Sequence, residues 1–208
     1  TVIDAAPQIM PNAFDEEMAG YAKKQLKASG MRILTSAALK GIAGEGHVER
    51  VTIDNGVLPA DLVILAIGVR PATGFLEGCG LEMFKGTILV DENLKTNLPD
   101  VYAAGDCAMV VNALTGKRQW SAMGSTANLA ARAMAKGFYG AGKGYGGCFG
   151  TGVVRLLPAL NGGRTGLTQE QAKAAGYEAT SVVCVMEDKA HYYPGASSFV
   201  VKLTAETA

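Results

Sequence analysis

The sequence predicts an α/β fold over its first part and a smaller α+β segment after it, with the boundary near Tyr145. Two observations support this division. Leu62 to Ile67 form an unbroken apolar run that ends at Gly68, which is typical of a parallel strand buried on both faces. Beyond a glycine-rich stretch at 140–150, three strand-like segments surround one short helical segment, the mixture expected of an α+β fold.

Local patterns predict the elements of the first part. Val2 to Asp4 resemble the end of a strand, and Asp15 to Ser29 have the spacing of an amphipathic helix that Gly30 ends. Asp54-Asn55-Gly56 predicts a hairpin turn after an alternating strand. Further strands are expected at 31–34, 48–53, 87–90 and 101–104, and an alanine-rich helix at 122–139.

The second part has a clear helix start. Thr168 is suited to cap a helix that runs to Ala175, and Gln171 stands at the third helical position, where it completes a capping box. Strands are expected on both sides of this helix, at 153–157, 181–186 and 198–203.

The composition indicates a folded chain without a strongly charged surface. Of its 208 residues 49% are hydrophobic and 18% are charged, which excludes a disordered chain. The 19 basic and 19 acidic residues cancel, so no charge excess points to nucleic acid, and no apolar run approaches the roughly 20 residues of a membrane span. We therefore expect a cytoplasmic protein that binds neither nucleic acid nor membrane.

The four cysteines, at 79, 107, 148 and 184, do not form a recognisable site. They include no CxxC pair, and only two histidines could join them, so we expect neither a metal site nor a disulfide framework. Cys79 lies in a Gly-Cys-Gly turn without a basic neighbour or a helix start to activate its thiol. All four cysteines are expected to be non-catalytic.

A literal GxGxxG is present at Gly142, Gly144 and Gly147. That motif binds a dinucleotide only where a strand leads into it and a helix leads out, whereas here a helix precedes it and a strand follows. A near match to a P-loop at 137–143 fails because Gly144 replaces the required Ser or Thr. We interpret this glycine-rich run as a linker.

A more informative motif is Gly105-Asp106, which follows the apolar segment Val101 to Ala104. Glycine allows a ligand to approach the backbone, and a carboxylate at the end of a strand can accept hydrogen bonds from sugar-alcohol hydroxyls. A lone Gly-Asp pair could equally cap the next segment. Three more motifs accompany it in order, namely Ala66-Ile67-Gly68-Val69-Arg70-Pro71, Thr96-Asn97-Leu98-Pro99-Asp100 and Gly124-Ser125-Thr126-Ala127-Asn128. Together they resemble the pyridine nucleotide-disulfide oxidoreductases, which are FAD-dependent.

The resemblance runs along the whole chain and implies partial FAD/NAD(P)-binding Rossmann-like domains followed by part of an α+β interface (dimerisation) domain. Residues 1–70 would be the C-terminal part of the NADH-binding domain, 71–145 that of the FAD-binding domain, and 146–208 the start of the interface domain. The two glycine loops and the redox-active cysteine of the family are not found in these residues. The chain is therefore expected to be the C-terminal half of a homodimeric enzyme, unable to run the reaction alone.

The resemblance also assigns flavin contacts. Asp106 would bind the ribitol of FAD, and Gly105 would allow that approach. Backbone N–H groups at the helix start near Met123 and Gly124 would face the pyrimidine edge of the flavin, where a helix N-terminus stabilises negative charge.

Four further residues receive cofactor roles in the same way. Thr126 and Asn128 would face the flavin or the coenzyme A channel, and Gly68 would lie beside the nicotinamide nucleotide. Asp4 ends a strand where such domains carry an acidic residue. A carboxylate there bonds a ribose 2′-OH and repels a 2′-phosphate, which favours NADH over NADPH.

Two C-terminal motifs narrow the resemblance, Arg164-Thr165-Gly166-Leu167-Thr168 and His191-Tyr192-Tyr193-Pro194-Gly195. With the helix start they are similar to the branch of coenzyme A disulfide reductases, NADH-dependent persulfide reductases and NADH oxidases, and the second motif favours the reductases. In that group a tyrosine of this stretch reaches the partner subunit's active site near the coenzyme A thiol. Tyr192, or else Tyr193, would be that catalytic residue. The alternative is an aromatic pair packed under a turn.

The expected function is the transfer of hydride from NADH through FAD to a cysteine-based disulfide or persulfide, with coenzyme A as the small-molecule thiol. One alternative is an NADH oxidase or peroxidase that uses a cysteine sulfenic acid. Another is a non-catalytic dimerisation module that kept the scaffold and lost the chemistry.

Overall fold

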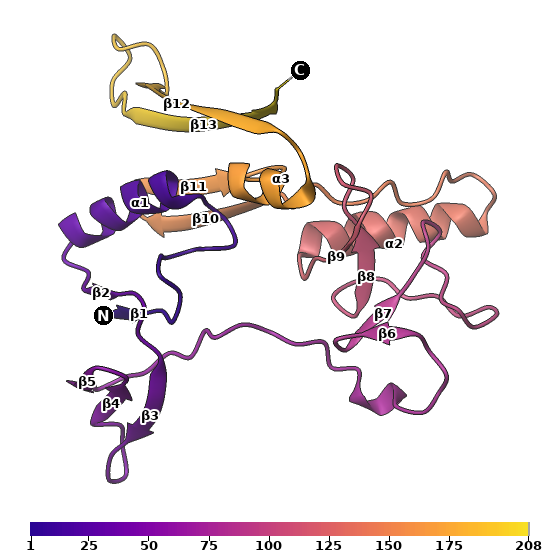
Figure 1. Cartoon of the computed structure of the whole chain (residues 1–208), viewed down its shortest axis with the longest axis horizontal. Helices are drawn as coiled ribbons and strands as arrows, with labels where there is room; N and C mark the ends of the chain where they lie inside the picture. The colour runs from indigo at the N-terminus through magenta and orange to yellow at the C-terminus, as the bar shows by residue number, and fades with distance from the viewer. Residues whose placement is uncertain (208) are drawn as a thin grey trace. The chain divides into compact units, whose positions relative to one another are not determined.

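A computed structural model describes residues 1–207, which divide into two compact units (Figure 1). The first unit combines residues 1–65 with 152–207, and the second consists of residues 66–151. The first unit therefore joins two stretches of chain that the sequence separates. We describe each unit by itself.

The N-terminal stretch of the first unit packs a helix beside a pair of parallel strands. Its elements are β1 (Val2–Ile3), α1 (Glu16–Ala28), β2 (Ile33–Leu34), β3 (Leu39–Ala43), β4 (Arg50–Ile53) and β5 (Gly56–Pro59). Helix α1 begins after Asp15 and ends at Ser29, and Gly30 follows with φ +93°, as the sequence predicts for a helix end. Strand β1 pairs in parallel with β2, and β3, β4 and β5 form a separate antiparallel sheet.

The C-terminal stretch completes this unit with β10 (Gly152–Leu157), β11 (Leu160–Arg164), α3 (Gln169–Ala175), β12 (Ala179–Glu187) and β13 (Ser198–Glu206). The predicted capping box of α3 is present, with Thr168 and Gln171 in their expected roles. Leu156 of β10 packs against the apolar side of α1, and Gly162 of β11 lies against the Phe14 ring. A Cβ at Gly162 would come within 3.1 Å of that ring, so a larger residue would require the Phe14 ring to shift by a few tenths of an ångström.

The second unit is built around a four-stranded sheet and one long helix. The elements are η1 (Gly74–Leu76), β6 (Met83–Phe84), β7 (Thr87–Leu89), β8 (Ala108–Val111), β9 (Arg118–Trp120) and α2 (Gly124–Phe138). The sheet order is β6-β7-β8-β9, in which β7 and β8 are parallel and the outer pairs are antiparallel. Residues Ile88, Val90, Leu94, Ala103 and Ala130 belong to its buried core.

The glycine-rich run after α2 is not a loose linker. The backbone N–H of Tyr145 donates to the carbonyl of Glu92, and Cys148 pairs with Asn112 in an isolated bridge. A Cβ at Gly144 would lie 2.7 Å from the Glu92 carbonyl oxygen, and one at Gly147 would lie 2.6 Å from that of Val111. These glycines allow the chain to pack closely against the backbone of its own unit.

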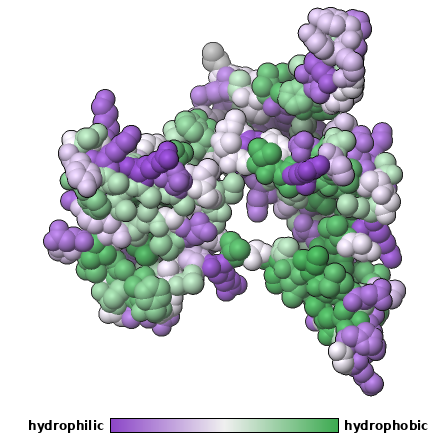
Figure 2. Space-filling view, turned by 180° about the vertical axis from the view of Figure 1, so that it is seen from behind, coloured by the Kyte–Doolittle hydropathy of each residue, from purple (hydrophilic) through white to green (hydrophobic). Residues whose placement is uncertain are grey.

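Two predicted strands are not formed as expected. Leu62 to Ile67 adopt no regular structure, and within this run Ile64 and Ile67 are 82% and 84% exposed. No strand among residues 1–207 pairs with this run, so it lacks the two covered faces that its composition indicates. Figure 2 shows a hydrophobic area at the surface of the part that carries β3 to β5. The other, Val101 to Ala104, contains only one bridge, between Tyr102 and Lys95.

Candidate flavin site

The segment that leads to Gly105 runs along helix α2 toward its first turn. The Tyr102 ring meets the Phe138 ring at the end of α2, edge to face, with centroids 4.8 Å apart. Three residues later Gly105 approaches Ala127, so a Cβ at Gly105 would lie 3.9 Å from the Ala127 Cβ. Asp106 therefore follows a segment that ends beside the N-terminal turn of α2.

Gly105 adopts φ +90°, a backbone conformation that favours glycine. Asp106 is exposed, and its carboxylate accepts no hydrogen bond from residues 1–207. Its backbone carbonyl instead accepts a bond from the Trp120 indole N–H, at 2.8 Å. The carboxylate thus does not cap the following segment, and Asp106 precedes β8 instead of ending a strand as the sequence analysis expects.

The N-terminus of α2 is open to a ligand. Met123 stands at the N-cap in an extended conformation (φ −130°, ψ 129°), and its side chain does not cap the helix. Gly124 and Ser125 are exposed, and no acidic residue stands in the first turn. Uncapped N–H groups and the positive end of the helix dipole favour a negatively charged or hydrogen-bond-accepting group. The residues present therefore fit a ligand that combines a polyol with an electron-rich ring edge, as FAD does.

Two further predicted residues lie on α2 but differ in surroundings. Asn128 is exposed, whereas Thr126 is buried and its Oγ1 lies 2.8 Å from the Ser121 Oγ. Thr126 also hydrogen-bonds with the side chain of Tyr145. Burial raises the pKa of Tyr145, and nearby Cys148 raises it further, so this phenol remains protonated. We infer that Thr126 anchors the start of α2 and that Asn128 is free to face a ligand.

The sequence pattern missed the groups that support this site. Trp120, Ser121 and Tyr145 belong to neither of the motifs at 101–107 and 124–128, and each contacts a motif residue, Ser121 from just before the second motif and the other two from 14 or more residues away. Trp120 is the single tryptophan, which is the one sequence signal that could have singled it out.

Gly105→Ala should reduce the flavin content of the full-length protein by about 10-fold, because the strained φ costs about 1–2 kcal/mol and the methyl group occupies the approach to the backbone. Absorbance of the purified protein measures the bound flavin. Gly116→Ala is the matched control, since Gly116 also has a positive φ, +67°, with nothing within 4 Å of its Cβ position. Equal flavin loss in both variants would contradict a role for Gly105 in the site.

The remaining predicted residues lie outside this cluster. Gly68, in the second unit, is exposed and has φ +103°. No atom beyond its chain neighbours lies within 4 Å of the position that a Cβ would take there. Asp4, in the first unit, is half-buried after β1, and its Oδ1 accepts a bond from the Ala6 N–H at 2.9 Å. The other carboxylate oxygen has no hydrogen-bond partner within residues 1–207.

Tyr192 and Tyr193 lie together in the loop that joins β12 to β13. Their ring centroids are 4.9 Å apart, and the two side chains are 74% and 55% exposed. Both rings are therefore more than half exposed within residues 1–207, in the loop that also contains Pro194. Two exposed phenols at a loop tip are suited to contact another molecule.

The cysteines form no pair in the structure. Cys79 is exposed and donates its S–H to the Leu76 carbonyl, Cys148 is buried, and Cys107 and Cys184 are partly buried as free thiols. Within residues 1–207 no three His, Cys, Asp or Glu side chains gather as metal ligands. The helices described over the same residues are all too short or too polar to cross a membrane.

The fold and this site define a class of protein. The family of pyridine nucleotide-disulphide oxidoreductases matches residues 1–137, and the chain belongs to that family. Its members are FAD- and NAD(P)H-dependent, and the relatives found are enzymes.

Three relatives illustrate which enzymes of this family the chain is similar to. The chain is 30% identical over 202 residues to an NADH oxidase of Methanocaldococcus jannaschii, covering 97% of the chain and 45% of that protein. It is also 30% identical over 203 residues to an NAD(P)H coenzyme A polysulfide/persulfide reductase of Pyrococcus horikoshii, with the same coverage. The solved structure of an NAD-dependent persulfide reductase from A. fulgidus matches with a TM-score of 0.91 and 30% identity, over 99% of this chain and 38% of that one. The chain spans less than half the length of these relatives.

Proposed function

We propose that this chain is part of an FAD-dependent oxidoreductase that passes hydride from NADH through the flavin to a cysteine-based disulfide or persulfide. Coenzyme A is the proposed small-molecule thiol. The observation that carries the proposal is the free carboxylate of Asp106, which follows the positive-φ Gly105 beside the uncapped N-terminus of α2. One relative is named an NAD(P)H coenzyme A polysulfide/persulfide reductase, and the paired tyrosines Tyr192 and Tyr193 support coenzyme A as the thiol.

The residues of the chain would bind and orient the flavin. Asp106 would accept hydrogen bonds from ribityl hydroxyls, and the N–H groups of Gly124 and Ser125 would stabilise negative charge at the edge of the ring. The chemistry that bound FAD would supply is the uptake of a hydride, which carries two electrons, and the transfer of these two electrons to a disulfide, which becomes two thiols after protonation. Asp4 would hold the ribose of NADH through its free carboxylate oxygen and disfavour the 2′-phosphate of NADPH.

The thiol chemistry would depend on residues of two subunits. The four cysteines here are free thiols that form no pair, and all four are expected to be non-catalytic, so we propose that the redox cysteine lies elsewhere in the full-length protein. In a cytoplasmic homodimer Tyr192 of one subunit would donate its O–H to the thiolate formed in the other, with Tyr193 stacked beside it.

The full-length protein tests this function directly. We expect it to purify with bound flavin and to oxidise NADH faster with coenzyme A disulfide than with oxygen as the acceptor. The printed names of the relatives include both NADH oxidase and persulfide reductase, so oxygen is the alternative acceptor. Turnover with oxygen alone would favour the oxidase, and protein without flavin would overturn the proposed site.

A further inference from the structure

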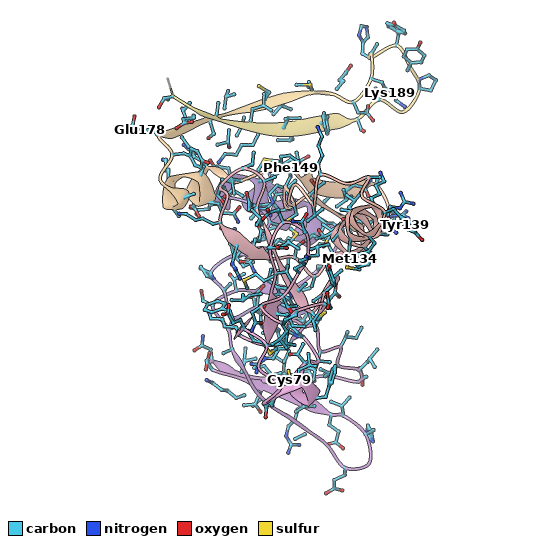
Figure 3. The ribbon with its side chains drawn as sticks, turned by 90° about the vertical axis from the view of Figure 1, so that its right-hand side faces the viewer. Cys79, Met134, Tyr139, Phe149, Glu178 and Lys189 are labelled. Carbon is cyan, nitrogen blue, oxygen red and sulfur yellow. The ribbon has the colours of Figure 1, made fainter. Side chains whose placement is uncertain are left out.

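The two tyrosines stand at the end of a long hairpin that is largely exposed. Strands β12 and β13 pair over nine residues without a register shift, from Ala179↔Glu206 to Glu187↔Ser198. Figure 3 shows this hairpin with Glu178 at its base and Lys189 at its tip. Apolar side chains along its length are exposed, among them Val182, Val185, Phe199 and Leu203. Within residues 1–207, therefore, few packing contacts hold the direction of this two-stranded ribbon.

The tip of the hairpin is closed by Asp188 and Ser197. The Ser197 N–H donates to the Asp188 Oδ1 at 2.9 Å, and the Ser197 hydroxyl donates to the Oδ2 at 3.1 Å. The Asp188 N–H in turn donates to the Ser197 carbonyl at 2.9 Å. The loop is thereby fixed to the end of the ribbon, so Tyr192 and Tyr193 move with it.

The base of the hairpin is attached to α3. The Ser181 hydroxyl donates to the Gln169 Oε1 at 2.7 Å, and the Gln169 amide donates to the Ala179 carbonyl at 3.3 Å. The Thr207 N–H donates to the Glu178 carbonyl at 2.7 Å. Within residues 1–207 all of these bonds lie at one end of the hairpin, so they do not by themselves fix the direction of its far end.

Lys202 supplies a contact at the middle of the hairpin. It pairs with Val183, four residue pairs from each end, or about 13 Å from either end at the usual rise of a strand. Its Nζ lies 2.8 Å from the Asp15 Oδ2 and 2.9 Å from the Glu17 Oε1, at the start of α1. The Lys202 and Asp15 side chains are 8% and 4% exposed. This buried ion pair therefore holds the ribbon against α1 at a point remote from its base.

Asp15 links the same contact to α3. It is the N-cap residue of α1, but its side chain does not cap that helix. Its carboxylate instead accepts the Gln169 N–H at 2.9 Å and the Glu170 N–H at 3.4 Å, at the first turn of α3. One carboxylate thus joins α1, α3 and β13, whose residues lie far apart in the sequence.

We propose that Lys202, held by Asp15 and Glu17, is a positioning residue that fixes the direction of the β12–β13 hairpin and with it the place of Tyr192 and Tyr193. The catalytic consequence rests on the proposed function, because it requires Tyr192 to act at the acceptor site. The structural consequence does not depend on any substrate.

Hydrogen exchange of the full-length protein tests the structural consequence. Lys202→Met keeps the length of the side chain and removes its charge, and we expect amides of residues 182–186 to exchange about 10-fold faster or more, while those of β10 and β11 change little. Lys202→Arg should restore slow exchange. Lys40→Met is the matched control, since Lys40 pairs with Asp54 on an exposed surface of the same unit. Should Lys202→Met fail to fold, Glu17→Gln removes only the half-exposed partner and should shift exchange in the same direction.

Steady-state kinetics test the catalytic consequence. In Lys202→Met we expect kcat/KM for coenzyme A disulfide to fall about 10-fold to 100-fold, as a misplaced reacting group predicts, while reduction of the flavin by NADH is unchanged. Unchanged exchange in the hairpin, or equally faster exchange in β10 and β11, would overturn the positioning role. If Tyr192→Phe leaves disulfide turnover unaltered, the proposed role of Tyr192 fails, and the exchange result still decides the role of Lys202.

Discussion

Leu94→Ala should lower the free energy of unfolding of the second unit by about 2–5 kcal/mol, the cost of a large-to-small change in a buried core. Leu94 is 1% exposed, the most fully buried large side chain of the described residues, and it packs in the cluster that contains Ala103 and Ala130. Its carbonyl also accepts the Ala103 N–H, just before Gly105. A cavity here should therefore weaken flavin binding as well as stability.

Urea denaturation followed by the fluorescence of Trp120 measures this change, because Trp120 lies in β9 of the same unit. Leu129→Ala is the matched control: Leu129 is 56% exposed on α2, and its replacement should alter stability by less than about 0.5 kcal/mol. Similar losses in both variants would contradict the assignment of Leu94 to the core.

Helix ends were predictable because their signals are local. The start of α3 at Thr168 and Gln171, and the end of α1 before Gly30, depend on residues within one turn of each other. The hairpin after Ile53 was predictable for the same reason, since its turn signal lies in adjacent residues that join β4 directly to β5.

Strands were harder because pairing decides them. Leu62 to Ile67 have the composition of a buried strand, yet no partner strand lies among residues 1–207. Leu39 to Ala43, in contrast, include Lys40 and Gly41 and still form β3, since β4 provides the partner. Composition predicts what a strand prefers, but only a neighbouring strand supplies its hydrogen bonds.

The candidate site likewise contains residues that the sequence predicts and contacts that it does not. The motifs around Gly105 and Gly124 were visible because each is continuous in the sequence. The bond from Trp120 to the Asp106 carbonyl, and the contact of Thr126 with Tyr145, join residues whose proximity arises only from folding. Asp15 is the extreme case, because its partners lie more than 150 residues away.

Asp15→Asn should lower the free energy of unfolding of the first unit by about 1–3 kcal/mol at about pH 7, because it leaves Lys202 with only the half-exposed Glu17 carboxylate as its charged partner. Burial by itself raises the pKa of Asp15, but hydrogen bonds from Lys202, from Thr168 and from the backbone of Gln169 and Glu170 outweigh it. The pKa therefore lies below its ordinary value of 3.8. A carboxylate whose pKa is lowered on folding contributes stability above its unfolded pKa, and that contribution is lost as the pH falls through the folded pKa.

The stability difference between the natural protein and Asp15→Asn should accordingly be constant near neutral pH and shrink as the pH falls below the ordinary pKa of 3.8. Urea denaturation at several pH values measures it. Asp54→Asn is the matched control, since Asp54 also pairs with a lysine, at 2.7 Å, but is 37% exposed and should contribute little. The two aspartates form ion pairs of nearly equal length, so a large effect at Asp15 alone would assign the difference to burial. If Asp15→Asn and Asp54→Asn lower stability equally, or if the Asp15→Asn difference persists unchanged at low pH, the charge of the Asp15 carboxylate does not hold α1, α3 and β13 together.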